Sequence, residues 1–184
     1  MASLKYWVWL SAQTGVSPAS KAALLRHYGD AESAYFAPKG GFRQIKGVTP
    51  ADAAILERRD MSNVEEIIAA CRRMDIRPIT MQDAAYPHRL RNIFAPPAVI
   101  YVKGKLPELD DEAVIAVIGT RKASPYGLKM GTRLALEIAK CGGIGLSGLT
   151  NGIDAVAAKG ALLAGGVCIG VLGTSHDRER GSLA

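Results

Sequence analysis

The apolar residues of this chain change their spacing near residue 113. Beyond that point, short apolar runs such as Val114–Ile118 alternate with longer amphipathic stretches. An apolar run that stops at a glycine is typical of a buried strand, and the stretches that follow have helical spacing. The predicted elements are strand 113–118, helix 125–141, strand 143–147, helix 152–164 and strand 167–172. This alternation indicates a parallel sheet, so we expect an α/β fold with a partial Rossmann-type sheet.

The first eighty residues have the pattern of short helices joined by glycine turns. Ser17–Pro18 can cap and start a helix that stops at Gly29, and apolar residues recur at helical spacing over 62–74. Segment 42–56 has the helix, glycine turn, helix order of a helix-hairpin-helix element. We therefore expect a small helical domain of helix-hairpin-helix or SAM-like type. Its turn could bind DNA phosphates or serve only for packing, and packing is favoured because little positive charge lies near it.

A connector separates the two patterns. Residues 77–80 and 95–104 each contain a short predicted strand, and the acidic run Pro107–Glu112 has the composition of an exposed linker. The sequence thus predicts three parts. They are a helical module over 1–80, an extended connector with a strand over 81–112, and a truncated Rossmann-like DNA-binding domain over 113–184.

Polar and glycine residues follow the first two strands of the predicted sheet. In an open parallel sheet, ligands bind outside the carboxyl ends of the strands, so both turns should lie at one edge. Gly119 would let a phosphate approach the backbone, Ser147 offers a hydroxyl, and Arg121 can hold a phosphate bidentately. The residues expected to contact a nucleic acid are Gly119, Thr120, Arg121, Lys122, Ser124, Tyr126, Gly127, Ser147, Gly148, Asn151, Gly152 and Lys159.

Several of these residues also have simpler interpretations, which stay open. Gly119 and Gly148 can be ordinary turn residues, Asn151 and Asp154 can be helix-terminal caps, and Lys159 can be a solvated helix residue. Near the turns, Tyr126 is the sole candidate for base stacking, so contacts to phosphates should dominate any binding.

Positive charge is concentrated in the second half. Residues 113–184 hold 8 Lys and Arg against 4 Asp and Glu, within a net charge of +6 for the chain. Between 113 and 135 lie four cations, Arg121, Lys122, Lys129 and Arg133, and no acidic residue. This distribution favours an anionic partner such as nucleic acid, and a solvated basic face is the alternative.

Motifs of several enzyme classes are missing. No G-x-G-x-x-G follows the strand 114–118, and the chain has no Walker loop and no H-E-x-x-H. Cys71, Cys141 and Cys168 form no C-x-x-C pair, and Ser147 has no evident histidine partner. We expect no catalytic residue, no metal and no cofactor. The sequence also shows neither a signal peptide nor a membrane span, so we expect a cytoplasmic protein.

In combination and in order, the motifs resemble the DNA-processing protein DprA family, also called Smf. The matching segments are the helical N-terminal module, Asp83–Leu90, Pro96–Pro97, Ile100–Gly104, Val117–Arg121, Tyr126–Gly127, Ser147–Leu149 and Gly152–Asp154. The resemblance implies an extended Rossmann-type domain that binds single-stranded DNA, with Arg121 as a contact. It also implies protection of incoming strands in natural transformation, loading of the recombinase RecA, and a homodimer.

The chain departs from the family pattern at two places. Ala157–Ala158 stand where the family has an Ala-His pair, and after Gly173 the chain lacks the family's Asp-x-x-Tyr-Pro segment. We expect the later strands to be missing, which leaves an open sheet edge. In the family, the later region is associated with the dimer contacts and much of the RecA-facing surface.

Three functional hypotheses follow from the sequence. The first is a non-catalytic single-strand binder. The second is a Rossmann-like nucleotide-processing enzyme, although the Pro-Gly-Gly-x-Gly-Thr loop of such enzymes is absent. The third is a truncated remnant without function.

Overall fold

The computed structural model describes residues 3–173. The chain divides into two compact units, Met1–Leu106 and Pro107–Ala184, and each is described by itself. Within residues 3–173, no helix combines the length and the apolar character that crossing a membrane requires.

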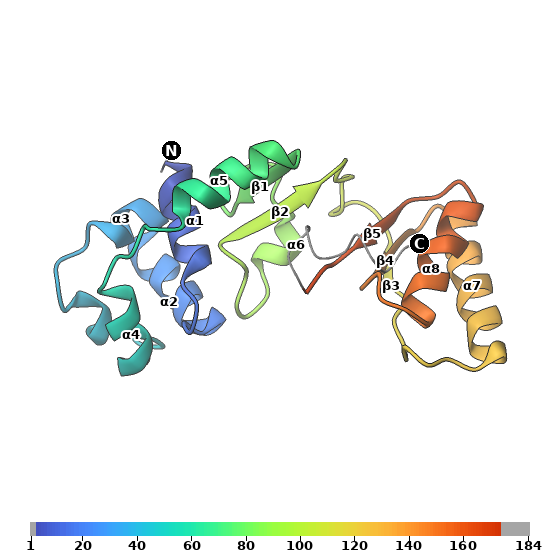
Figure 1. The fold of residues 1–184 in the computed structure, drawn as a ribbon, viewed down its shortest axis with the longest axis horizontal. Helices are drawn as coiled ribbons and strands as arrows, with labels where there is room; N and C mark the ends of the chain where they lie inside the picture. The colour runs from blue at the N-terminus through green and yellow to red at the C-terminus, as the bar shows by residue number, and fades with distance from the viewer. Residues whose placement is uncertain (1–2, 174–184) are drawn as a thin grey trace. The chain divides into compact units, whose positions relative to one another are not determined.

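The first unit consists of helices and one antiparallel strand pair (Figure 1). Its elements are α1 (Leu4–Ala12), α2 (Pro18–Tyr28), α3 (Ala31–Tyr35), the 3₁₀ turn η1 (Gly41–Gln44), α4 (Pro50–Leu56), α5 (Val64–Arg73), β1 (Ile76–Thr80), α6 (His88–Arg91) and β2 (Val99–Lys103). The helices predicted from 17 and over 62–74 are confirmed as α2 and α5. β1 and β2 pair with Ile76 opposite Lys103, so the connector's strand belongs to the same unit as the helices.

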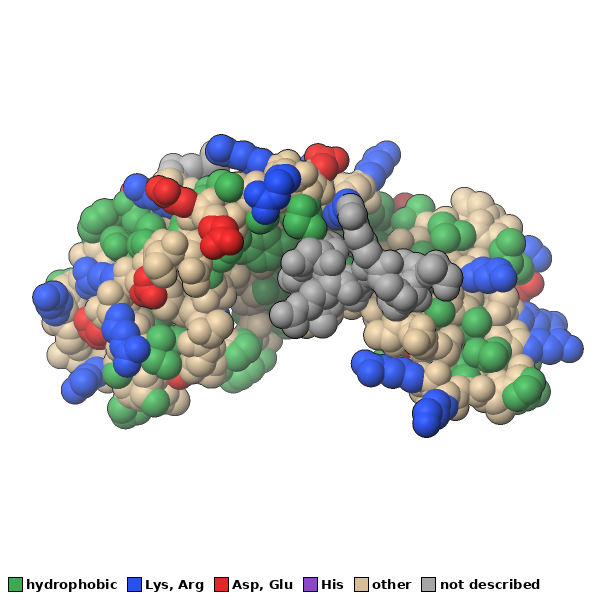
Figure 2. Space-filling model, in the orientation of Figure 1, with side chains coloured by type: hydrophobic (Ala, Val, Ile, Leu, Met, Phe, Trp, Pro, Cys, Tyr) green, Lys and Arg blue, Asp and Glu red, His purple; other side chains and the backbone are tan. Residues whose placement is uncertain are grey.

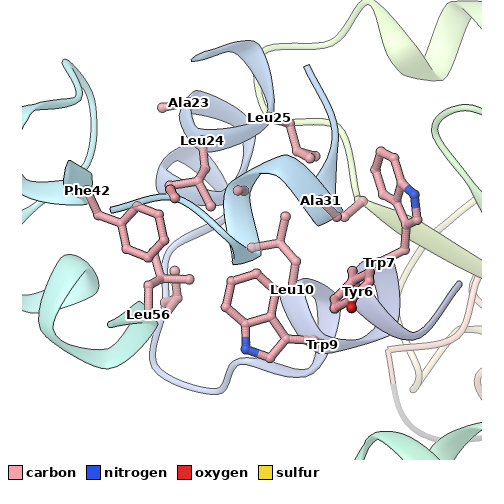
Figure 3. Close-up of a cluster of buried hydrophobic side chains, with 14 of the residues drawn as sticks. Tyr6, Trp7, Trp9, Leu10, Ala23, Leu24, Leu25, Ala31, Phe42 and Leu56 are labelled. Carbon is pink, nitrogen blue, oxygen red and sulfur yellow. The ribbon is translucent and has the colours of Figure 1, made fainter. Parts of the chain in front are cut away.

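Large apolar side chains from four helical segments form the core of the first unit (Figure 3). Trp9 and Leu10 of α1 are fully buried, as are Leu24 of α2, Phe42 of η1 and Leu56 of α4. Short helices are marginal in isolation, so this shared core supplies most of their stability.

The predicted hairpin turn packs against α2. The Ser20 hydroxyl donates to the carbonyl of Gly47 at 3.2 Å and accepts from the N–H of Thr49 at 3.4 Å. Gly47 has a φ of 96°, and a Cβ there would lie 3.3 Å from the Cβ of Ala23. These polar groups of the turn are bonded within the protein, which favours the packing interpretation.

The second unit is a three-stranded parallel sheet with two helices. Its elements are β3 (Val114–Ala116), α7 (Pro125–Lys140), β4 (Ile144–Ser147), α8 (Ile153–Leu163) and β5 (Cys168–Gly170). The strand order β3-β4-β5 confirms the predicted partial Rossmann-like sheet, although β3 and β5 are shorter than expected. Parallel strands in sequence order are almost always joined by right-handed crossovers, which place both helices on one face of the sheet.

α7 and α8 approach each other closely. A Cβ on Gly160 would lie 2.4 Å from the carbonyl oxygen of Thr132, so only glycine fits at this crossing. Beneath the helices, Val117, Ala135 and Ala157 form a small core with Ile138 and Ile153. This core packs the second half of α7 and the first turns of α8 against the end of β3.

Candidate nucleic-acid interface

Two turns lie side by side at one edge of the second unit's sheet. The first turn, residues 119–122, follows β3, and the second turn, residues 148–151, follows β4. The strands are parallel, so their carboxyl ends meet at the same edge. The N–H of Val117 donates to the carbonyl of Leu146 at 2.9 Å, which continues the pairing up to the turns. The structure thus brings together the two segments that the sequence placed on one edge.

The buried carboxylate of Asp154 connects the two turns. Its Oδ1 accepts a hydrogen bond from the N–H of Gly119 at 3.1 Å, and its Oδ2 accepts one from the Thr150 hydroxyl at 2.9 Å. The backbone carbonyl of the same residue accepts from the Ser147 hydroxyl at 3.1 Å. Asp154 is only 6% exposed. Its main role is therefore to hold both turns against the start of α8, beyond the simple capping role that the sequence left open.

Glycines allow the turns to approach this closely. Gly152 has a φ of 85°, and a Cβ there would lie 2.2 Å from the carbonyl oxygen of Thr120. A Cβ on Gly148 would lie 2.7 Å from Oδ2 of Asp154, and one on Gly119 would lie 2.7 Å from Cγ1 of Ile153. All three glycines therefore serve close packing within the protein.

Leu149 fixes the second turn in a way that the sequence did not reveal. Its φ of 52° is unusual for a residue other than glycine. Its side chain fills the space over β5, since a Cβ on Gly170 would lie 2.1 Å from Cδ1 of Leu149. A positive φ at leucine has no sequence signal, because it results from contacts between distant segments.

The starts of the two helices differ in charge. The first turn of α7 contains no acidic residue, whereas the first turn of α8 contains Asp154. The first backbone N–H of α8, that of Ile153, donates to the carbonyl of Thr120 at 3.2 Å. Helix N-termini attract anions through their dipoles, and of these two helices only α8 has a carboxylate that offsets this attraction. Of the two helix starts, the one without an acidic residue, that of α7, is therefore the more favourable for an anion.

Exposed cations lie next to the start of α7. Arg121 and Lys122 are exposed, and so is Tyr126, at 73%. The N–H of Lys122 donates to the Thr120 hydroxyl at 3.2 Å, which shapes the first turn. Figure 2 shows blue Lys and Arg side chains over the loop that leads into α7 and along this helix. These side chains offer charge and one aromatic ring to an anionic chain.

Other residues expected at the site have supporting positions. Ser124 caps α7, with its hydroxyl accepting from the N–H of Gly127 at 3.2 Å. Ser147 is 1% exposed, and its hydroxyl is already bonded within the protein, so its side chain is not open to a ligand. Asn151 is exposed at the second turn. Lys159 is exposed too, but it lies six residues into α8, about 9 Å along the axis.

Comparison with known proteins places these features in a family. The model of the family described as DNA recombination-mediator protein A matches residues 77–181. The chain is 34% identical to the DNA processing protein DprA of Bacillus subtilis over 119 residues, covering 64% of this chain and 40% of that protein. It is 28% identical to the protein Smf of Synechocystis over 176 residues, covering 94% of this chain and 44% of the relative. The chain thus spans less than half the length of these relatives.

A solved structure has the same fold. The X-ray structure of DNA processing protein A (DprA) from Streptococcus pneumoniae aligns with a TM-score of 0.72 at 24% identity. The alignment covers 96% of this chain and 60% of that chain. The resemblance noted in the sequence is confirmed by these matches, and the chain belongs to the DNA recombination-mediator protein A family, whose relatives carry the names DprA and Smf.

Proposed function

We propose that this chain binds single-stranded DNA without sequence preference, through the first turn and the start of α7. The observation that carries the proposal is the exposure of Arg121 and Lys122 beside a helix N-terminus that has no acidic residue. Membership of a family described as a recombination mediator supports DNA as the anionic partner. Phosphates are the same in every sequence, so binding through them is independent of sequence.

The site residues divide into contacts and supports. Arg121 can hold a phosphate with two parallel N–H donors, and Lys122 adds a point charge. Tyr126 can stack on a base. Thr120 and Asn151 lie exposed at the two turns and complete the contact surface, which Lys159 would extend along α8. The supporting residues are Gly119, Ser124, Gly127, Ser147, Gly148 and Gly152.

The proposal includes a biological role. As the family resemblance implies, binding would protect single strands during DNA uptake and natural transformation, and would help to load RecA. The role requires no catalytic step, because binding and release of the strand suffice. A homodimer is part of the same proposal. Co-sedimentation of the chain with RecA, with and without a single strand, tests the first partner. Sedimentation of the chain alone, with and without the strand, tests the homodimer.

Fluorescence anisotropy with a labelled thymine strand tests the binding. Each phosphate contact contributes roughly 0.7 to the slope of log affinity against log salt concentration. Loss of one contact in Arg121→Ala should therefore weaken binding by about fivefold in 0.1 M salt, one log unit below 1 M. For wild type, an about fourfold rise in salt should weaken the binding by about sevenfold if two phosphates are neutralised.

Lys140→Ala is the matched control for this experiment. Lys140 is an exposed cation at the far end of α7 and pairs with Glu137 at 3.3 Å. The control should bind like wild type. An affinity that does not change with salt concentration, or an equal loss of affinity in Arg121→Ala and Lys140→Ala, would contradict the proposed site.

A further inference from the structure

The outward face of α7 carries two stripes of side chains that run side by side. Successive helical residues are rotated by about 100°, so residues three and four apart share a face. Tyr126, Met130 and Leu134 form an apolar stripe, with exposed fractions of 73%, 40% and 55%. Lys129 and Arg133 are also exposed and form a cationic stripe next to it.

Neither stripe belongs to the packing face of the helix. α7 buries Gly131 and Ala135, and a Cβ on Gly131 would lie 3.2 Å from Val156 of α8. Gly131 and Ala135 are rotated by about 100° and 140° from Met130, the middle of the apolar stripe, so the middle of the stripe points away from α8. Their exposure is a property of the second unit itself.

The cationic stripe continues the charge of the first turn. From Arg121 to Arg133 the sequence has no acidic residue, and the next acid, Glu137, pairs with Lys140 at 3.3 Å. The distance along the axis from residue 125 to residue 133 is about 12 Å. At roughly 3.4 Å for each nucleotide, that length matches three or four nucleotides.

We propose that a DNA single strand bound at the first turn continues along α7. Its phosphates lie on Lys129 and Arg133, and its bases lie against Tyr126, Met130 and Leu134. A single strand has a charged backbone on one side, which fits the cationic stripe, and apolar base faces on the other, which fit the apolar stripe. This inference rests on the proposed function and extends its site.

Charge argues against a second copy on this face. Two α7 helices paired antiparallel about a two-fold axis would bring their cationic stripes together, where like charges repel. DNA, in contrast, is attracted by both the stripe and the adjoining first turn. The continuity of positive charge between them therefore favours the strand.

Binding of two strand lengths tests the path. A short strand of about four nucleotides that is held by Arg121 and Lys122 is too short to reach the end of the stripes as well, whereas one of about twelve nucleotides spans both. The double variant Lys129→Ala/Arg133→Ala should weaken binding of the long strand by about 25-fold in 0.1 M salt and reduce its salt slope by roughly 1.4. It should weaken binding of the short strand much less than that of the long strand, and the control Lys140→Ala should change neither.

The outcomes separate this inference from the proposed function. If Arg121→Ala weakens binding of both strands while the double variant behaves like Lys140→Ala, the path along α7 is wrong and the site at the first turn stands. If wild type binds neither strand, the proposed function itself fails. Self-association of wild type in sedimentation that Met130→Ser/Leu134→Ser abolishes would make the stripe a protein contact and overturn the proposal. Circular dichroism confirms that each variant is folded.

Discussion

Replacement of Asp154 should separate support of the turns from contact with DNA. Asp154→Ala removes the acceptor for the N–H of Gly119 and for the Thr150 hydroxyl. Hydrogen bonds to a charged group contribute about 1.5–3 kcal/mol each, and Asp154 is too buried for solvent to screen them strongly. Gly119 and Thr150 are partly open to water and regain some hydrogen bonding. The expected loss in the free energy of unfolding is therefore about 2–4 kcal/mol.

Asp154→Asn provides the contrast. Its amide oxygen still accepts from the N–H of Gly119, and its amide nitrogen can donate to the Thr150 oxygen, so the connection survives without the charge. We expect a loss of about 1 kcal/mol in the free energy of unfolding. Affinity for DNA should not fall, because the substitution removes a negative charge next to the first turn. Asp154→Ala should instead weaken binding, because the first turn loses its position.

Hydrogen exchange at the Gly119 amide gives the direct measurement. The amide should exchange faster in Asp154→Ala and close to the wild-type rate in Asp154→Asn, with anisotropy following the binding of DNA in parallel. Unchanged exchange and unchanged affinity in Asp154→Ala would refute the role of this carboxylate. If Asn weakened binding as much as Ala, the charge itself would be required and the argument from position would be wrong.

Three further predictions concern the two units separately. Gly152→Ala should destabilise the second unit by about 1–3 kcal/mol through overpacking against Thr120, and should weaken DNA binding; an unchanged thermal transition would contradict this. The polar side chains of Ser20 and then Ser17 beside the Asp52 carboxylate lower the pKa of Asp52, and the Ser17 hydroxyl donates to its Oδ2 at 2.8 Å. The ionised carboxylate of Asp52 therefore stabilises the first unit at pH values above its unfolded pKa near 3.8. This contribution is lost as the pH falls through the pKa of Asp52 in the folded protein, which is lower. Urea unfolding from neutral pH to about pH 3 should show a smaller decrease in stability for Asp52→Asn than for wild type, and parallel curves would exclude the effect. Phe42→Ala, at a side chain that is 0% exposed, should cost about 3–5 kcal/mol in urea unfolding, and a cost below about 1 kcal/mol would mean that the site repacks.

The alternation of strands and helices in the second unit was predictable because each buried strand is a short apolar run that ends at a polar turn. The ends of β3 and β5 were less predictable. Ile118 and Val171 continue the apolar runs but are exposed beyond the paired residues. Hydrophobicity indicates burial, whereas the length of a ladder depends on the neighbouring strand.

At the site, the positions of the turns followed from the sequence but the roles within them did not. Ser147 has the residue type of a ligand contact, yet its hydroxyl is bonded to a backbone carbonyl seven residues later. The importance of Asp154 depends on a backbone N–H from a turn 35 residues away. Arg121 was the simpler case, because an arginine two residues after a strand-end glycine remains exposed in the structure.

The contact between Leu149 and Gly170 couples the position of β5 to that of the second turn. Any shift of this strand pushes on a side chain whose backbone is already held at a φ of 52°. Leu149 is followed by Thr150, whose hydroxyl donates to Asp154 at the start of α8, so a displacement of the loop reaches the carboxylate that positions Gly119. A residue on the third strand can thus change the position of the backbone at the end of the first, so variation far from the basic surface would alter the DNA contact that we propose there.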